Sequence, residues 1–167
     1  MAVQIPIQAV HDAQEADFGL RDILLAIAGP ESGWDSQAKG DCKLAWGGII
    51  VPCITPGSFP TSFSYTQLHI DGGLGDGIPP ERLLNGVYNF QLAARHIRGE
   101  IASGKSLYDA LWPWSARPAI WALYERIQAE GIEGVSTGNG REPPPLPVSH
   151  NALVPILGLL AIWIVVS

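Results

Sequence analysis

A glycine- and proline-rich segment near the C-terminal end constrains this chain more than any other feature. Residues 131–151 read GIEGVSTGNGREPPPLPVSHN, with the glycines first and a proline cluster after them. Glycine-rich chain is flexible and proline-rich chain is stiff and extended, so the segment has the composition of a linker. We therefore expect a folded domain over residues 1–130, a linker over residues 131–151 and a separate segment beyond it.

The segment beyond the linker is strongly apolar. Residues 152–166, ALVPILGLLAIWIVV, carry no charged or strongly polar side chain. As a helix at about 1.5 Å per residue they would span roughly 22 Å, less than the ~30 Å hydrocarbon core of a bilayer. Pro155 would also remove a helical hydrogen bond near the start. Two interpretations stay open for residues 152–167: a short membrane anchor, or a segment that docks in a hydrophobic groove of a partner protein.

Charge and cysteine content exclude several classes of partner. Ten Lys and Arg against sixteen Asp and Glu give a net charge of −6, which opposes phosphate backbones, so we expect no nucleic-acid partner. The two cysteines, Cys42 and Cys53, have no metal-ligand spacing, so we expect no metal and no cofactor. A disulfide between them and two buried thiols are equally compatible with the sequence. The N-terminal residues lack the pattern of a cleaved secretory signal.

Helical periodicity dominates the expected domain. Apolar residues recur at i, i+3, i+4 and i+7 from Leu20 to Ile27, which predicts a helix over residues 17–28 with Asp17 as its cap. Because the residue before a proline resists the α conformation, this helix should end near Gly29. Further helices are expected over residues 79–102, over residues 106–111 with Ser106 and Asp109 as a capping pair, and from Pro118 onward.

The stretch between the first two helices is irregular. Residues 32–78 are rich in Gly, Pro, Ser and Thr and alternate only weakly between apolar and polar side chains. They predict loops with at most a short hairpin or two. The expected fold class is therefore mainly α, a helical domain with an irregular or small β-hairpin lobe after its first helix.

Glu31 is the side chain best suited to acid–base chemistry. It follows Pro30 directly and so lies where the first helix is expected to end. The negative end of the helix dipole and the apolar neighbours Ile27 and Trp34 both disfavour a charged carboxylate, and therefore raise its pKa. A carboxyl that holds its proton near neutral pH can act as a general acid on a glycosidic oxygen. We predict Glu31 as the catalytic residue.

Four segments stand in a characteristic order over roughly residues 15–130. They are AIAGPESGW at 26–34, SYTQLH at 64–69 followed by GGLG at 72–75, NFQLAA at 89–94, and LWPWS at 111–115. Together they resemble the catalytic Glu-Ser segment, the Ser-x-Gly-Leu-x-Gln-Ile segment, the Asn-x-x-x-Ala-Ala helix and the closing aromatic turn of the lysozyme-like superfamily. The resemblance is to lytic transglycosylases and phage lysozymes in particular. It implies an α+β lysozyme-like fold.

The resemblance also implies a reaction, cleavage of the β-1,4 bond between N-acetylmuramic acid and N-acetylglucosamine in peptidoglycan. In a lytic transglycosylase Glu31 alone acts, first as the acid and then as the base that closes a 1,6-anhydro ring. A lysozyme-type muramidase needs a second carboxylate, for which the loops offer Asp35, Asp41, Asp71 and Asp76 without distinguishing among them. We favour the single-Glu mechanism at this point.

Four further residues are predicted to bind substrate. Gln67 offers an amide that both donates and accepts hydrogen bonds, and Ser32 is adjacent to Glu31. Tyr65 and Trp112 offer flat faces for pyranose rings, as do Trp34, Trp46 and Trp114, and for each of the five a core position is the simpler interpretation. His69, beside Asp71, is expected to be a paired surface residue.

The predicted setting is a virion or the bacterial cell envelope. The wall-cleaving domain, the apolar C-terminal segment and the absence of a secretory signal fit a phage enzyme that opens the host wall, with peptidoglycan glycan strands and virion proteins as partners. The alternative is a catalytically inactive structural or glycan-binding component of a phage particle or envelope complex. Departures from the family pattern at Tyr65 and at residues 112–114 keep that alternative open.

Overall fold

The computed structural model describes residues 4–13, 18–45 and 47–136. The chain divides into two units near residue 137, and every described residue belongs to the first. The cap predicted at Asp17, Trp46, the rest of the linker from residue 137 and the apolar segment over 152–167 lie outside the described residues. No helix in the described ranges is both long and apolar enough to cross a membrane.

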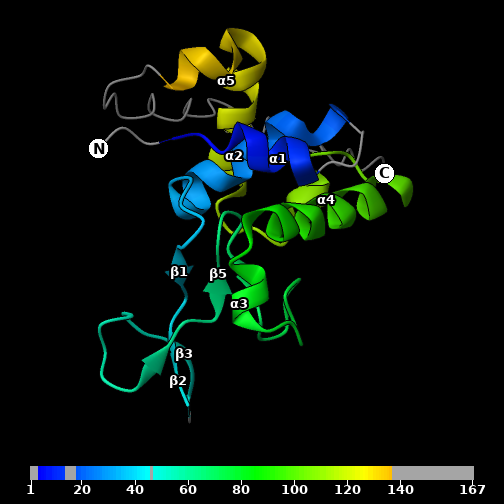
Figure 1. The fold of residues 1–167 in the computed structure, drawn as a ribbon. Helices are drawn as coiled ribbons and strands as arrows, with labels where there is room; N and C mark the ends of the chain where they lie inside the picture. The colour runs from blue at the N-terminus through cyan, green and yellow to red at the C-terminus, as the bar shows by residue number, and fades with distance from the viewer. Residues whose placement is uncertain (1–3, 14–17, 46, 137–167) are drawn as a thin grey trace, which may run out of the picture. The chain divides into compact units, whose positions relative to one another are not determined.

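The core is built around one buried helix, α2 (Arg21–Ser32), whose residues from Ile23 to Ala28 are all buried. Helix α5 (Arg117–Ser136) and the short α1 (Ile7–Ala13) pack against α2, and α1 also packs against α4 (Gly86–Ala102) (Figure 1). Helix α1 lies outside the helices predicted from the sequence. Six consecutive buried residues place every side of α2 in the core, whereas the apolar stripe from Leu20 to Ile27 predicted a single buried face.

Helix α2 does not end near Gly29, so that prediction is wrong. The helix continues through Pro30 to Ser32 and ends at Gly33, whose φ of 63° is left-handed. The residue before Pro30 is a glycine, which lacks the Cβ that would clash with the proline ring in a helix. The amides of Gly33 and Trp34 then donate to the carbonyls of Gly29 and Ala28 and complete the helix end.

The later helices follow the predicted starts better than the predicted lengths. The region expected as one helix over residues 79–102 is two, α3 (Pro80–Leu83) and α4, because the Asn85 side chain caps α4 by accepting from the Tyr88 amide at 3.0 Å. The Ser106 and Asp109 capping pair forms ahead of the 3-10 turn Asp109–Leu111. Helix α5 begins beside Pro118 as predicted and bends at Gly131, the expected domain boundary, before it ends at Ser136.

The irregular region contains more sheet than predicted, as two small antiparallel sheets of three strands each. One sheet has the order β1 (Lys39–Gly40), β5 (Ser62–Phe63), β6 (Leu68–His69), and the other has the order β3 (Gly47–Ile50), β2 (Lys43–Leu44), β4 (Ser58–Phe59). All of these strands except β3 have two residues, too few for an alternating pattern to appear in the sequence.

A disulfide joins Cys42 and Cys53, which settles the pairing that the sequence left open.

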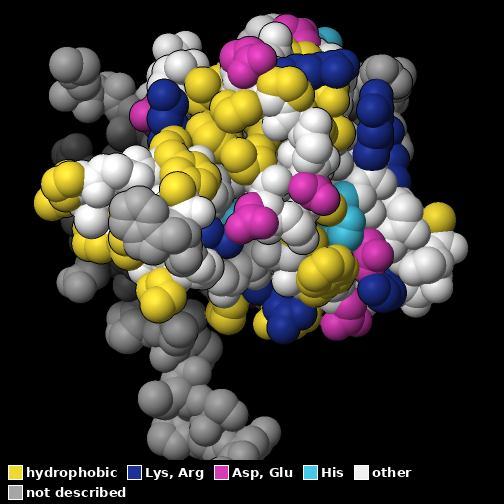
Figure 2. Space-filling view, turned by 90° about the horizontal axis from the view of Figure 1, so that it is seen from below, with side chains coloured by type: hydrophobic (Ala, Val, Ile, Leu, Met, Phe, Trp, Pro, Cys, Tyr) yellow, Lys and Arg dark blue, Asp and Glu magenta, His cyan; other side chains and the backbone are white. Residues whose placement is uncertain are grey.

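Taken together, the helices and the two small sheets make the described residues an α+β domain in which helices outweigh strands. Figure 2 views the domain from the side on which the strands lie, and acidic side chains and histidine adjoin near the middle of that face.

Candidate active site

Glu31 lies in the last turn of α2 and is half-buried. Burial raises the pKa of its carboxyl above the ordinary value, the negative charge of Asp41 raises it further, and a hydrogen bond from the Ala116 backbone N–H partly opposes both. Its Oε1 atom is buried and has no hydrogen-bond partner among the described residues. The pKa shift therefore has the direction predicted from the sequence, with desolvation as the main cause.

Ser32 does not hold the Glu31 carboxyl. Its hydroxyl donates at 2.9 Å to the Ala28 carbonyl, one turn earlier in α2. A hydroxyl has a single hydrogen to donate, so this bond uses it within the helix. The Trp34 indole likewise donates to the Leu25 carbonyl at 3.0 Å, and both bonds fix the helix end on which Glu31 stands.

Asp41 is the carboxylate that the structure places near Glu31. It follows β1, and its φ of 47° is left-handed, a conformation that Asp tolerates better than most residues. Its Oδ2 atom accepts from the Ser62 hydroxyl at 2.8 Å and lies 2.9 Å from His69 Nε2. His69 is therefore a paired residue as predicted, although its close partner is Asp41 and not the neighbouring Asp71.

The other three candidate aspartates are placed differently. Asp71 is exposed and pairs with Lys43, which lowers the pKa of Asp71. Asp35 is exposed and accepts a hydrogen bond from the Gln37 amide at 2.8 Å, and Asp76 is exposed. Of the four, only Asp41 is among the causes of the Glu31 shift. Sequence reasoning did not separate them because each lies in a Gly- or Ser-rich turn.

Gln67 belongs to the same hydrogen-bond network as Asp41. Its Oε1 lies 3.1 Å from the Ser62 hydroxyl that donates to Asp41, and its Nε2 donates to the Ser64 carbonyl at 2.8 Å. Gly40 makes room for it, since a Cβ at that position would come within 2.5 Å of Gln67 Oε1. The Gln67 side-chain amide thus stabilises the turn between β5 and β6. This structural role is simpler than substrate binding, the other role that its chemistry allows.

This turn is anchored to the helices by two side chains from distant segments. Asn89 of α4 accepts from the Thr66 amide at 3.0 Å and from its hydroxyl at 2.7 Å, and donates to the Phe63 carbonyl at 3.1 Å. The Trp114 indole donates to the Thr66 carbonyl at 2.8 Å. These bonds therefore connect residues from three of the four segments on which the resemblance rests. Glu31, from the remaining segment, accepts from the backbone of Ala116, which no sequence signal distinguished.

The two predicted sugar-stacking residues are placed in different surroundings. Tyr65 is half-buried and stacks on Phe90 of α4, with 4.8 Å between ring centroids. Trp112 is 58% exposed and meets His96 edge-on at 5.7 Å. Trp114, for which a core position was the simpler interpretation, is indeed buried. Tyr65 thus supports the turn next to the network, while the ring contacts of Trp112 lie farther along α4.

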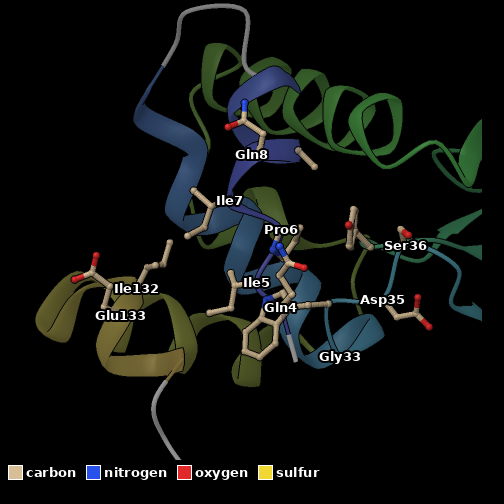
Figure 3. A pocket seen from close by; sticks show the side chains of 13 residues that line it. Gln4, Ile5, Pro6, Ile7, Gln8, Gly33, Asp35, Ser36, Ile132 and Glu133 are labelled. Atoms are coloured by element: carbon tan, nitrogen blue, oxygen red, sulfur yellow. The ribbon is translucent and has the colours of Figure 1, made fainter. Parts of the chain in front are cut away.

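An open groove of about 1280 Å³ adjoins this region (Figure 3). Its walls come from the N-terminal segment around Pro6, from residues 33–36, from Tyr65 and from Ile132 and Glu133 at the end of α5. Glu31 and Gln67 are not among the lining residues. Of the lining residues, Gly33 is the nearest to Glu31 in the sequence, two positions after it.

Comparison with known proteins gives no relative for this chain. No protein-family model matches it, and neither a curated protein nor a solved structure does. Within the described ranges, no three His, Cys, Asp or Glu side chains are grouped as a metal site would require.

Proposed function

We propose that this protein is a peptidoglycan glycosidase that cleaves the β-1,4 bond between N-acetylmuramic acid and N-acetylglucosamine. The observation that carries the proposal is the Glu31 carboxyl, half-buried at a helix end, with a raised pKa and a buried Oε1 left without a partner. Such a group keeps a proton that it can deliver to a glycosidic oxygen. Structural carboxylates in contrast usually have all of their oxygens hydrogen-bonded or solvated.

The chemistry then proceeds from the proton on Glu31. Transfer of that proton to the bridging oxygen lets the glycosidic C–O bond break, and positive charge develops on the muramic acid ring. Asp41, held by Ser62 and His69, supplies a negative charge near the acid. It would either stabilise this cation or take a proton from the attacking water. Asp41 therefore favours hydrolysis over the single-Glu transglycosylase mechanism that the sequence alone suggested.

The arrangement of elements also supports a lysozyme-like fold. The acid stands at the end of a buried helix, and the second carboxylate follows a strand of a small antiparallel sheet. Nine residues separate the two along the chain. The proposed setting remains a virion or the bacterial cell envelope.

A zymogram on purified peptidoglycan tests the proposal. We expect a clearing band from the wild-type chain and its loss in Glu31→Gln, with a decrease of about 10² or more in rate. Asp71→Asn is the matched control, because Asp71 is exposed and pairs with Lys43. Equal clearing by wild type and Glu31→Gln would remove Glu31 from the mechanism.

Product masses decide between the two mechanisms. Hydrolysis leaves reducing ends, and Asp41→Asn should then lose activity as well. Anhydro ends with an active Asp41→Asn variant would restore the single-Glu mechanism.

A second candidate function has one observation in its favour. The Gln67 amide and the Ser32 hydroxyl, both predicted to bind substrate, make their hydrogen bonds within the protein. A catalytically inactive structural component of a phage particle or envelope complex would fit that arrangement. A wild-type chain that neither binds insoluble peptidoglycan nor releases fragments from it would select this function.

A further inference from the structure

The lobe closed by the disulfide is nearly free of charged side chains. We define the disulfide lobe as residues 42–59, which contain β2, β3 and β4. Its single charged residue is Lys43, which pairs with Asp71 outside the lobe, and residues 44–70 contain no Asp, Glu, Lys or Arg. A partner of this surface is therefore not selected by charge.

Large apolar side chains cover the disulfide lobe and are exposed. Ile54 is 93% exposed, Ile49 is 76%, Ile50 is 58% and Phe59 is 43%. None of the residues from 43 to 59 whose burial is described is buried, and none belongs to the hydrophobic core. In Figure 2 hydrophobic side chains are visible on the part of the molecule that projects at the left. Because these side chains do not stabilise the fold from within, their apolar character points to something outside the chain.

The exposed side chains lie on both faces of the outer sheet. Ile49 and Ile50 are consecutive residues of β3, and successive side chains of a strand point to opposite faces. Ile54 extends from the loop that follows, and Phe59 lies on β4 at the other edge. A protein groove covers one face of such a lobe, whereas a fluid hydrocarbon layer surrounds all of it. The distribution therefore favours lipid as the partner.

The lobe is also held in one conformation before any partner binds. The disulfide closes it, β2 pairs with both β3 and β4, and the Val51 amide donates to the Cys42 carbonyl at 2.7 Å. A flexible loop loses conformational entropy when it binds a partner, and this loss weakens binding. The disulfide lobe is already ordered in the free protein and so avoids that cost.

We propose that the disulfide lobe inserts its aliphatic tip into the interfacial layer of a lipid bilayer. Insertion is shallow, because β3 and β4 are sheet edges whose unpaired backbone groups need water or lipid headgroups. Since Lys43, the single charged residue of the lobe, is paired with Asp71, binding does not require anionic lipid and is insensitive to salt. The proposal uses no residue of the candidate active site and stands independently of the glycosidase activity.

Co-sedimentation of the full chain with vesicles tests this inference. We expect binding to vesicles of phosphatidylcholine alone and equal binding when phosphatidylglycerol is mixed in, unchanged by added NaCl. The triple variant Ile49→Ser, Ile50→Ser, Ile54→Ser should lose at least about tenfold in partition coefficient, since one fully buried aliphatic side chain changes it by roughly that factor. Ile101→Ser, an exposed isoleucine of α4, is the matched control and should bind like wild type.

Several outcomes would overturn the inference. One is no sedimentation of the wild-type chain, and another is sedimentation that needs phosphatidylglycerol and disappears with salt. Equal sedimentation of wild type and the triple variant would assign lipid binding to residues 152–167 instead. The single variant Ile54→Ser is the control in case the triple variant misfolds, because the Ile54 side chain is almost fully exposed and its loss should not affect folding. It should still bind vesicles several-fold more weakly than wild type. Glu31→Gln should bind as wild type does, so a failed glycosidase assay leaves this result interpretable.

Discussion

The two small sheets of the described residues have three strands each and opposite polarity. The inner sheet, β1–β5–β6, and the turn beside it bury the polar residues Thr61, Ser62, Ser64 and Thr66, while the outer sheet, β3–β2–β4, exposes isoleucines and a phenylalanine. Burial of polar groups is unfavourable unless hydrogen bonds satisfy them, and exposure of apolar groups is unfavourable in water. The inner sheet offsets this cost with the hydrogen bonds of Thr61, Ser62 and Thr66, whereas the outer sheet departs from what stability alone favours, at the proposed lipid surface.

The largest effect is expected where the inner sheet is tied to the helices. Asn89→Ala removes the acceptor for the Thr66 amide and hydroxyl and the donor to the Phe63 carbonyl, all of them buried. We expect a loss of about 3 kcal/mol in the free energy of unfolding, measured by urea denaturation. Asn85→Ala on the same helix removes one exposed cap and should cost about 1 kcal/mol. Equal losses would mean that the buried bonds add nothing to the inner sheet.

The next largest effect is expected when a methyl group is added to the inner sheet, and the outer sheet serves as the comparison. In Gly40→Ala the new Cβ would approach Gln67 Oε1 to 2.5 Å, so the Gln67 side chain must shift, at a cost of about 1–3 kcal/mol. Gly48→Ala in the outer sheet meets nothing within 4 Å and should leave the stability unchanged within about 0.5 kcal/mol. Thermal denaturation of the two variants compares the packing directly, and similar melting temperatures would contradict the crowding at Gly40.

A smaller effect on stability is expected from the raised pKa of Glu31, and its pH dependence distinguishes Glu31 from a carboxyl with an ordinary pKa. Burial raises the pKa of Glu31 in the folded state, so the unfolded chain releases this proton at a lower pH than the folded protein does. As pH rises from the unfolded-state pKa to the folded-state pKa, wild type therefore becomes less stable. Glu31→Gln avoids that loss. It should therefore melt higher than wild type at neutral pH and equal it at pH values well below 4.5, the ordinary value. Glu81→Gln, on the exposed start of α3, serves as the control, and a melting difference that does not change with pH would contradict the raised pKa.

The smallest effect is expected for the most exposed side chain of the outer lobe. Ile54→Ser should change the free energy of unfolding by no more than about 0.5 kcal/mol, because no folded contact is lost. A destabilisation above about 1 kcal/mol in urea would show that Ile54 packs within the protein. The outer sheet would then resemble the inner one in being stabilised from inside.

Sequence patterns predicted most of the helices because helix signals are local, although they missed α1 and the break between α3 and α4. The apolar stripe from Leu20 to Ile27, the Ser106 and Asp109 pair and Pro118 each act within one or two turns, and each is found where it was expected. The end of α2 was missed because the rule for residues before proline depends on a Cβ that Gly29 lacks. The strands were missed because two-residue pairings depend on partners distant in the chain.

The candidate site was predictable in part for the same reason. The direction of the Glu31 shift follows from its own neighbours and helix end, whereas the choice of Asp41 among four aspartates depends on Ser62 and His69, more than twenty positions away. The internal use of the Ser32 hydroxyl and the Gln67 amide likewise depends on the folded backbone. Tertiary hydrogen bonds decide these roles, and a single sequence contains no record of them.

The position of Glu31 on α2 determines how the protein would lose the proposed activity on heating. An acid borne by a mobile loop can be displaced while the rest of the fold survives, whereas this one extends from the most deeply buried helix of the domain. Its proton donor therefore keeps its position until the core itself melts, so heating should abolish the proposed glycosidase activity and the cooperative fold at one and the same temperature.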